Sequence, residues 1–300
     1  MELGVKEKLQ GIFAPIATPF KYNEDLDADA MAHNLELYRN SSLRGYLVLG
    51  SNGENRSLDE TEKLSVLETV IKSISDQSTT IVGVMYEAFR HAKQFIQQVA
   101  KLGADFALVQ SPSYFGKMMT DEVLYAWFSS LADSSSIPLL VYNSPTFNGI
   151  TLSFDLLMKL SGHPNIVGIK DSTHDCDTAI MQLNRESFHV MAGSISKLSA
   201  FMHHGSIGGT VSLANYCPTL AVELYHCLLE NELPACTDLD RKLIGANKSI
   251  SGRFGVPGVK AAMNLMGFRA GIPRRPLLEL QSADIEMVKS TLIDIGALRK

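Results

Sequence analysis

The sequence predicts a (β/α)₈ barrel, the TIM-barrel fold, because eight short apolar runs alternate with helical patterns through most of the chain. In chain order the runs are IFAPIATPF, GYLVLG, TTIVGV, FALVQS, PLLVYN, IVGIKD, HVMAG and GGTVSL. Each run is apolar at nearly every position, which is typical of a parallel strand covered on both faces of its sheet. Eight such units in one chain favour a closed barrel over an open sheet.

Amphipathic segments separate the runs, and we expect them to form the outer helices. In residues 59–76, for example, Leu64, Leu67, Val70 and Ile74 lie at helical spacing. The alternative architecture, an open doubly wound sheet, normally carries a glycine-rich nucleotide turn after an early strand. The second run ends instead in GSNGE, which does not match G-x-G-x-x-G and is not followed by a Walker-type lysine. The barrel is therefore the favoured architecture.

The chain after the eighth run is longer than one closing helix requires. Four segments with helical patterns follow that run: 218–231, 235–250, 256–267 and 283–296. We interpret the first as the eighth barrel helix and the others as a C-terminal helical extension. The sequence thus predicts a barrel in residues 1–231 and an extension packed on the barrel in residues 232–300, with no linker between them.

The composition excludes several classes of protein. The 300 residues are 45% hydrophobic and 20% charged, with a net charge of −5 and scattered lysines and arginines, so the basic patch of a nucleic-acid binder is missing. No apolar stretch reaches the roughly 18 residues of a membrane span, and MELGVKEKLQ is not typical of a signal peptide. The cysteines have no zinc-type spacing: Cys176, Cys217, Cys227 and Cys236. We expect reduced thiols, a cytoplasmic location, and neither nucleic acid nor membrane as a partner.

Lys170 differs from most other lysines, which lie on mixed-charge helices or near the termini. It follows the apolar residues 166–169 at the end of the sixth run, and barrel active sites form at the C-terminal ends of strands. An ammonium buried there costs free energy unless it is paired or loses its proton. Desolvation lowers the pKa of a lysine, and the neutral amine can form an imine with a carbonyl group. The alternative is an ion pair with Asp171 or with an acid across the barrel.

Two tyrosines are candidates for proton transfer. Tyr142 ends the fifth run, next to the sixth strand, and a phenol beside an imine can exchange protons with a substrate oxygen. Tyr114 follows the fourth run and can act in the same way from a loop. The alternatives are an aromatic cap on the barrel mouth for Tyr142 and an ordinary surface residue for Tyr114.

The loop 50–54, Gly-Ser-Asn-Gly-Glu, lies just before a helix. Backbone N–H groups of such a turn near a helix N-terminus form a ready site for a carboxylate. We interpret Glu54 as a local cap or as the partner of a neighbouring arginine such as Arg56. His203 and His204 are neighbours on a predicted helix and point in different directions, so a chelating pair is not expected. Nothing in the sequence requires a metal.

Three motifs carry a resemblance to a known family. GSNGE after the second run, YNSP after the fifth and GIKDS after the sixth, in that order, resemble the family of dihydrodipicolinate synthase and N-acetylneuraminate lyase. These are lysine-dependent (class I) pyruvate aldolases and synthases. The resemblance extends from about Gly11 to Leu280 and includes RFGVPGVK at 253–260. It implies that Lys170 forms a Schiff base with pyruvate, without a separate cofactor, and that Tyr142 is the general acid and base.

The resemblance also implies roles for the residues around the lysine. Ser51 and Asn52 would bind the carboxylate of the keto acid, and Tyr114 matches a tyrosine that commonly reaches into a neighbouring subunit's site. The remaining positions implied to bind or line the substrate are Gly50, Ser172, Gly193, Thr210 and Val211. Members are usually homotetramers, built as a dimer of tight dimers, and the same assembly is expected here.

Departures from the family patterns bear on the substrate. Dihydrodipicolinate synthases usually carry G-T-T-G-E where this chain has Ser51 and Asn52, and an arginine shortly after YN-x-P where this chain has Phe147. Without that guanidinium, a bidentate carboxylate clamp is missing. Neuraminate lyases usually show a Ser-Thr pair in the loop.

The Ser-Asn pair, the Lys-Asp-Ser of 170–172 and RFGVPGVK look most like 4-hydroxy-2-oxoglutarate aldolase, which cleaves its substrate to pyruvate and glyoxylate. Ser172 would then help to hold a carboxylate. The alternatives within the family are dihydrodipicolinate synthase, which condenses pyruvate with aspartate semialdehyde, and a sugar-acid aldolase or dehydratase. A non-catalytic binding protein that retains the pocket and a metal-dependent aldolase are the alternatives from other classes.

Overall fold

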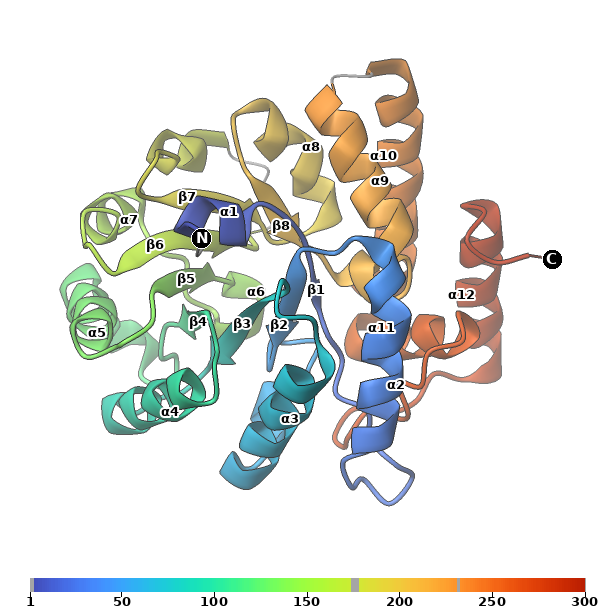
Figure 1. Ribbon diagram of the computed structural model, residues 1–300, viewed down its shortest axis with the longest axis horizontal. Coiled ribbons are helices and arrows are strands. Elements are labelled where there is room, and N and C mark those ends of the chain that lie inside the picture. The colour runs from blue at the N-terminus through green and yellow to red at the C-terminus, as the bar shows by residue number, and fades with distance from the viewer. Residues whose placement is uncertain (1–2, 174–177, 231–232, 300) are drawn as a thin grey trace.

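The computed structural model describes residues 3–173, 178–230 and 233–299, and it contains a closed barrel of eight parallel strands (Figure 1). The strands pair in chain order, and β8 pairs with β1 to close the barrel. Their bounds are β1 (Gly11–Pro15), β2 (Gly45–Val48), β3 (Thr79–Val84), β4 (Phe106–Gln110), β5 (Leu139–Asn143), β6 (Ile166–Asp171), β7 (His189–Ala192) and β8 (Gly208–Thr210). The predicted (β/α)₈ barrel is confirmed.

The first and the eighth apolar runs extend farthest beyond their strands. The first run continues to Phe20, whereas β1 ends at Pro15. The eighth run continues to Leu213, whereas β8 ends at Thr210 and the 3₁₀ helix η5 (Ser212–Asn215) follows. Phe20 and Leu213 are almost fully buried, and apolar content alone does not separate a strand from a buried loop that continues it.

Helices surround the barrel and connect its strands (Figure 1). The helices and 3₁₀ turns between β1 and β8 are α2 (Ala28–Tyr38), η1 (Arg39–Ser41), η2 (Asn55–Ser57), α3 (Glu60–Ser73), α4 (Phe89–Lys101), η3 (Gly116–Met118), α5 (Asp121–Asp133), α6 (Pro145–Asn148), α7 (Phe154–Leu160), η4 (Thr178–Leu183) and α8 (Ile195–His203). The helix expected in 59–76 is α3, which begins with a capping box between Asp59 and Glu62.

Helix α1 (Val5–Leu9) lies at the N-terminal end of the strands and closes the interior of the barrel there. Leu9 is fully buried and belongs to the same apolar cluster as Phe13, Leu47 and Phe106, which point inward from three strands. The ammonium of Lys8 lies 2.8 Å from the carboxylate of Asp105, just before β4. The opposite, C-terminal end of the strands is therefore the open end.

The last quarter of the chain is helical, as expected. Its elements are α9 (Pro218–Glu230), α10 (Leu233–Asn247), the π-helical turn η6 (Lys248–Gly252), α11 (Arg253–Leu265) and α12 (Ser282–Asp294). α10 packs against α9 and α8, and α11 packs against α12 (Figure 1). The division at residue 231 stays a prediction.

The cysteines depart from the expectation of reduced thiols. Cys227 on α9 and Cys236 on α10 form a disulfide, with their Cα atoms 5.6 Å apart. The expectation was wrong for this pair because the two helices form a hairpin that brings the thiols together, and the sequence does not reveal this contact. Cys217 is free and buried, and Cys176 lies outside the described residues. In the described part of the chain, no helix has the length and hydropathy of a membrane span.

Candidate active site

Lys170 and Tyr142 lie side by side at the open end of the barrel. They are register partners on β6 and β5, so their side chains point to the same face of the sheet. The Lys170 ammonium lies 4.5 Å from the centre of the Tyr142 ring. Tyr142 is 2% exposed and Lys170 is 6% exposed. The pairing of a buried amine with a phenol, expected from the strand ends, is present.

The side chain of Asp171 makes no ion pair with Lys170. As the next residue on the strand it points to the opposite face, where the ammonium of Lys197 lies 2.5 Å from its carboxylate. The amide of Asn143 and the hydroxyl of Thr173 donate to the same carboxylate, at 2.9 Å and 2.8 Å. Among the residues that the structure describes, no carboxylate lies within ion-pair distance of Lys170. The alternative of an ion-paired Lys170 is therefore not supported.

The loop after β2 places Ser51 beside Tyr142. The two hydroxyl oxygens are 3.3 Å apart, and the amide of Asn52 donates to the hydroxyl of Ser212 at 2.8 Å. Leu49 and Glu54 bracket the loop with φ values of 58° and 53°, in the left-handed region that non-glycine residues rarely adopt. The loop thus brings the Ser51 hydroxyl to the phenol and holds the Asn52 amide against Ser212.

The sequence suggests that Glu54 pairs with Arg56, but the two side chains do not pair in the structure. Its carboxylate lies 2.6 Å from the ammonium of Lys260, on α11, and accepts the backbone N–H of Arg274 at 2.8 Å. Arg56 pairs with Glu87 instead, at 3.4 Å. The expectation was wrong because it considered only near neighbours in the sequence, whereas the C-terminal helices return to this loop.

A cavity of about 270 Å³ opens at Lys170. The predicted residues that line it are Lys170, Tyr142, Ser51, Asn52, Ser172 and Gly193. Hydroxyl and amide side chains make up much of the remaining wall: Thr146, Thr173, Ser194, Ser196, Ser212, Asn247 and Ser251. Among the described residues that line the cavity, Lys170 carries the one positive charge. The cavity is therefore polar, with a single cationic group.

Three of the predicted substrate-binding residues do not line the cavity, and some residues that do line it were not predicted. Gly50, Thr210 and Val211 are buried and are not among the lining residues. Asn247 and Ser251 were missed because they belong to the C-terminal helices, where no reactive pattern marked them. The π-helical geometry of η6 is a feature that often accompanies functional sites, but it is not visible in a sequence.

Gly193 is required for steric reasons. A Cβ atom at this position would lie 2.0 Å from the Ser172 hydroxyl oxygen and 2.4 Å from the backbone oxygen of Asp171. These distances are far shorter than any real contact, so only glycine allows β7 to approach the end of β6 at this point. The approach brings the ends of these two strands together in the wall of the cavity.

Tyr114 lies away from this cavity. Its side chain is 81% exposed and meets the ring of Phe115 edge-on, with the ring centres 5.0 Å apart. A second hollow of about 410 Å³ shares Ser51 and Phe147 with the lysine cavity. Its exposed surface is mainly apolar, from Met85, Phe254, Val256, Pro257 and Leu277 among others. Its polar lining residues include Glu54, Arg56 and Gln110.

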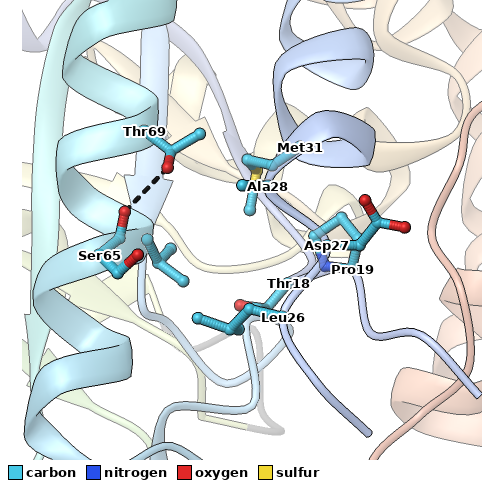
Figure 2. Close-up of a pocket in the computed structure, with 9 residues that line it drawn as sticks. Thr18, Pro19, Leu26, Asp27, Ala28, Met31, Ser65 and Thr69 are labelled. Carbon is cyan, nitrogen blue, oxygen red and sulfur yellow. Dashed lines mark hydrogen bonds between the residues drawn. The ribbon is translucent and has the colours of Figure 1, made fainter. Parts of the chain in front are cut away.

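A third hollow lies between α2 and α3 (Figure 2). Its accessible volume is about 10 Å³, enough for about one water molecule and too small for an organic acid. Metal sites do not add a further candidate: within the described residues, no group of three or more His, Cys, Asp or Glu side chains gathers at binding distance. The imidazoles of His203 and His204 each contact a backbone oxygen one turn earlier.

Comparison with known proteins gives consistent results over the whole chain. The 4-hydroxy-tetrahydrodipicolinate synthase of Caldicellulosiruptor saccharolyticus is 28% identical, over 96% of this chain and 97% of that protein. The enzyme of the same name from Bartonella bacilliformis is 26% identical, over 97% of this chain and 100% of that protein. Among solved structures, dihydrodipicolinate synthase from Aquifex aeolicus has a TM-score of 0.87 at 27% identity, over 97% of this chain and 100% of that one.

A monomeric dihydrodipicolinate synthase variant has a TM-score of 0.92 at 25% identity, over 99% of this chain and 100% of that one. Residues 8–295 match the dihydrodipicolinate synthetase family. The match covers nearly the whole chain and includes both strands that carry Lys170 and Tyr142. The chain therefore belongs to the dihydrodipicolinate synthetase family of class I pyruvate aldolases and is an enzyme of the lyase class.

Proposed function

We propose that this enzyme holds a 2-oxo acid as a Schiff base on Lys170 and cleaves a short 4-hydroxy-2-oxo acid, with 4-hydroxy-2-oxoglutarate as the leading candidate, to pyruvate and an aldehyde. The observation that carries the proposal is the Lys170 amine itself. It is buried beside Tyr142, has no carboxylate partner among the described residues, and faces a polar cavity. The chemistry needs neither a metal nor a separate cofactor, because the imine is the electron sink.

The reaction begins when Nζ of Lys170 attacks the 2-oxo carbon and water leaves, which forms a protonated imine. The C3–C4 bond then breaks, and its electron pair moves into the imine to give an enamine. Tyr142, whose hydroxyl is 3.3 Å from that of Ser51, relays the proton of the C4 hydroxyl away as the aldehyde forms. The relay returns a proton to C3, and water hydrolyses the imine to release pyruvate and the lysine.

The side chains that line the cavity favour a short substrate, because their donors can bind both ends of the acid. The loop residues Ser51 and Asn52 supply donors for the first carboxylate, next to the imine carbon. Ser172 and the neighbouring hydroxyls supply donors for the other end of the acid. Phe147 lines the wall at the position where synthases usually carry an arginine, and it offers no charge to the carboxylate of aspartate semialdehyde.

Two alternatives remain within the family. The relatives carry the name 4-hydroxy-tetrahydrodipicolinate synthase, and that activity is the first alternative. A sugar-acid aldolase or dehydratase is the second, and the hydroxyl-rich wall is compatible with it. A cleavage screen coupled to pyruvate detection, run with 4-hydroxy-2-oxoglutarate and sugar acids beside a condensation assay with aspartate semialdehyde, distinguishes the three.

The assembly is also part of the proposal. We propose a homotetramer in the cytoplasm, built from dimers in which Tyr114 of each subunit enters the site of its partner. The exposed Tyr114 and the open, mainly apolar hollow beside Ser51 and Phe147 support this arrangement, since an aromatic side chain fits such a hollow. Sedimentation of the wild type and of Tyr114→Ala tests it, and a monomeric wild type with full activity would refute it.

Chemical trapping tests the Schiff base. Borohydride added with pyruvate should reduce the imine and leave the pyruvyl mass on the peptide that contains Lys170. Lys170→Ala should lose both labelling and turnover, whereas the control Lys117→Ala, in the exposed η3 turn, should keep both. Tyr142→Phe should slow turnover more than labelling. An active enzyme with an unlabelled Lys170 would refute the mechanism, and loss of activity in EDTA would favour a metal-dependent aldolase.

Labelling without turnover on any substrate would identify a non-catalytic pyruvate-binding protein. This outcome would leave the lysine chemistry intact but remove the aldolase step.

A further inference from the structure

The loop that presents Ser51 and Asn52 has an unfavourable backbone. Leu49 and Glu54, at its two ends, both have positive φ, although neither is a glycine. Such conformations persist only where the surrounding contacts determine them. Asn55 holds the start of the loop, because its amide donates to the backbone oxygen of Leu49 at 2.8 Å. The end of the loop requires a separate anchor.

Lys260 supplies that anchor from α11. Its ammonium lies 2.6 Å from the carboxylate of Glu54 and donates to the backbone oxygens of Thr18 and Ile272, at 2.8 Å and 2.6 Å. The hydroxyl of Thr18, a residue labelled in Figure 2, donates in turn to the backbone oxygen of Gly53 at 2.7 Å. One ammonium is thus connected to the last two residues of the loop, directly to Glu54 and through Thr18 to Gly53.

The anchor depends on charge as well as on packing. Two of the ammonium's three donors bind backbone oxygens, and the Glu54 carboxylate lies at ion-pair distance from the same nitrogen. The side chains of Lys260 and Glu54 are only 1% and 2% exposed, so neither charge is compensated by water. If the ammonium were absent, the buried carboxylate would lose its direct ion-pair partner, and the loop would relax toward a conformation that exposes Glu54.

We propose that Lys260 is a positioning residue, which holds Ser51 and Asn52 in the geometry that binds the carboxylate of the 2-oxo acid. The inference rests on the proposed function, since it assigns that carboxylate to the loop. Lys260 is not among the residues that line the lysine cavity, so it acts through Glu54 and not on the substrate. The C-terminal helical segment thereby takes part in substrate binding without contacting the reacting atoms.

Variants of the pair provide the first test. Lys260→Met should raise the pyruvate concentration for half-maximal borohydride labelling by roughly tenfold or more, because a carboxylate loses well-placed hydrogen bonds. The limiting rate of labelling at saturating pyruvate should change much less, because Lys170 and Tyr142 do not move. Glu54→Gln should have a similar effect, and the double variant should add little to either single one.

Lys8→Met is the matched control. It removes a partly buried ion pair with Asp105 at the closed end of the barrel, so it destabilises the fold without touching the loop. Its half-saturating pyruvate concentration should equal that of the wild type. An equal rise in Lys8→Met and Lys260→Met would overturn the inference, because it would show a general effect of stability.

The wild-type pH profile provides a test that needs no variant. Two charged groups face Lys260: Glu54, in the loop after β2, and Arg274, in the segment after α11. Arg274 is itself paired with Glu62 of α3, and it donates to the backbone oxygen of Glu24. Burial lowers the pKa of Lys260 to about 8, against the raising effect of the Glu54 carboxylate. The ammonium is therefore lost as the pH rises through this value.

At pH 9, about one pH unit above that pKa, roughly one molecule in ten keeps the charge. The half-saturating pyruvate concentration should thus rise up to about tenfold between pH 7 and pH 9. In Lys260→Arg, which stays charged over this range, the rise should be absent. A flat wild-type profile would overturn the inference. Failure of the proposed function looks different, because wild-type Lys170 would then not be labelled at any pyruvate concentration.

Discussion

Replacement of Lys197 by methionine should strongly destabilise the fold. Lys197 and Asp171 are 3% and 2% exposed at their side chains, and their charged atoms are 2.5 Å apart. Removal of one partner of a buried pair typically costs 3–5 kcal/mol, because the other charge stays buried. Asp171 would keep the donors of Asn143 and Thr173, so we expect the lower end of that range, about 3 kcal/mol.

This loss can be measured by urea denaturation and by thermal melting followed by circular dichroism. For a chain of this length, each kcal/mol lowers the Tm by roughly 2 °C, so the expected drop is about 6 °C. Lys72→Met is the control, because its ammonium is 76% exposed and its pair with Glu68 contributes at most about 1 kcal/mol. Addition of Asp171→Asn to Lys197→Met should recover about half of the loss. A drop in Tm below about 2 °C, or a double variant less stable than the single one, would refute this reasoning.

Three other changes have defined outcomes. Gly193→Ala should abolish turnover and borohydride labelling, because the new methyl group would lie 2.0 Å from the Ser172 hydroxyl oxygen; activity within threefold of wild type would contradict this expectation. Cys227→Ser should lower the free energy of unfolding by about 2.5–3 kcal/mol under oxidising conditions, because the disulfide with Cys236 closes a short loop, with a sequence separation of 9. After reduction, the substitution should have no effect. Phe147→Arg should increase kcat/KM for condensation with an aldehyde that bears a carboxylate, relative to an uncharged aldehyde. Pyruvate consumption measures both reactions, and Phe147→Leu is the control. An equal change for both aldehydes would count against a role of this position in specificity.

The barrel could be predicted because parallel strands buried on both faces have few polar positions, so each strand is visible as an apolar run. Lys170 and Tyr142 could be located for the same reason. Each is a reactive side chain at the end of such a run, and neighbouring strands of a barrel place their ends together. The strand boundaries at Pro15 and Thr210 were less clear because the buried chain after them is apolar as well.

Contacts between distant segments were not predictable from one sequence. The pairs Glu54–Lys260 and Asp171–Lys197 join separate elements, and charged partners far apart in the chain leave no periodic pattern. The same applies to Asn247, which reaches the cavity from the end of α10. These residues share a cause, since each depends on how the C-terminal helices or α8 pack against the mouth of the barrel.

Helix α1 seals one end of the barrel, so reactants share a single way in and out. Leu9 is wedged among the inward-pointing side chains at that end, while Lys170 stands near the other. In the proposed cleavage, the three-carbon fragment would remain bound to Lys170 while the aldehyde forms. We therefore expect the aldehyde to leave before the imine is hydrolysed, and pyruvate to bind before the aldehyde in the reverse direction. Product-inhibition kinetics should show this obligatory order.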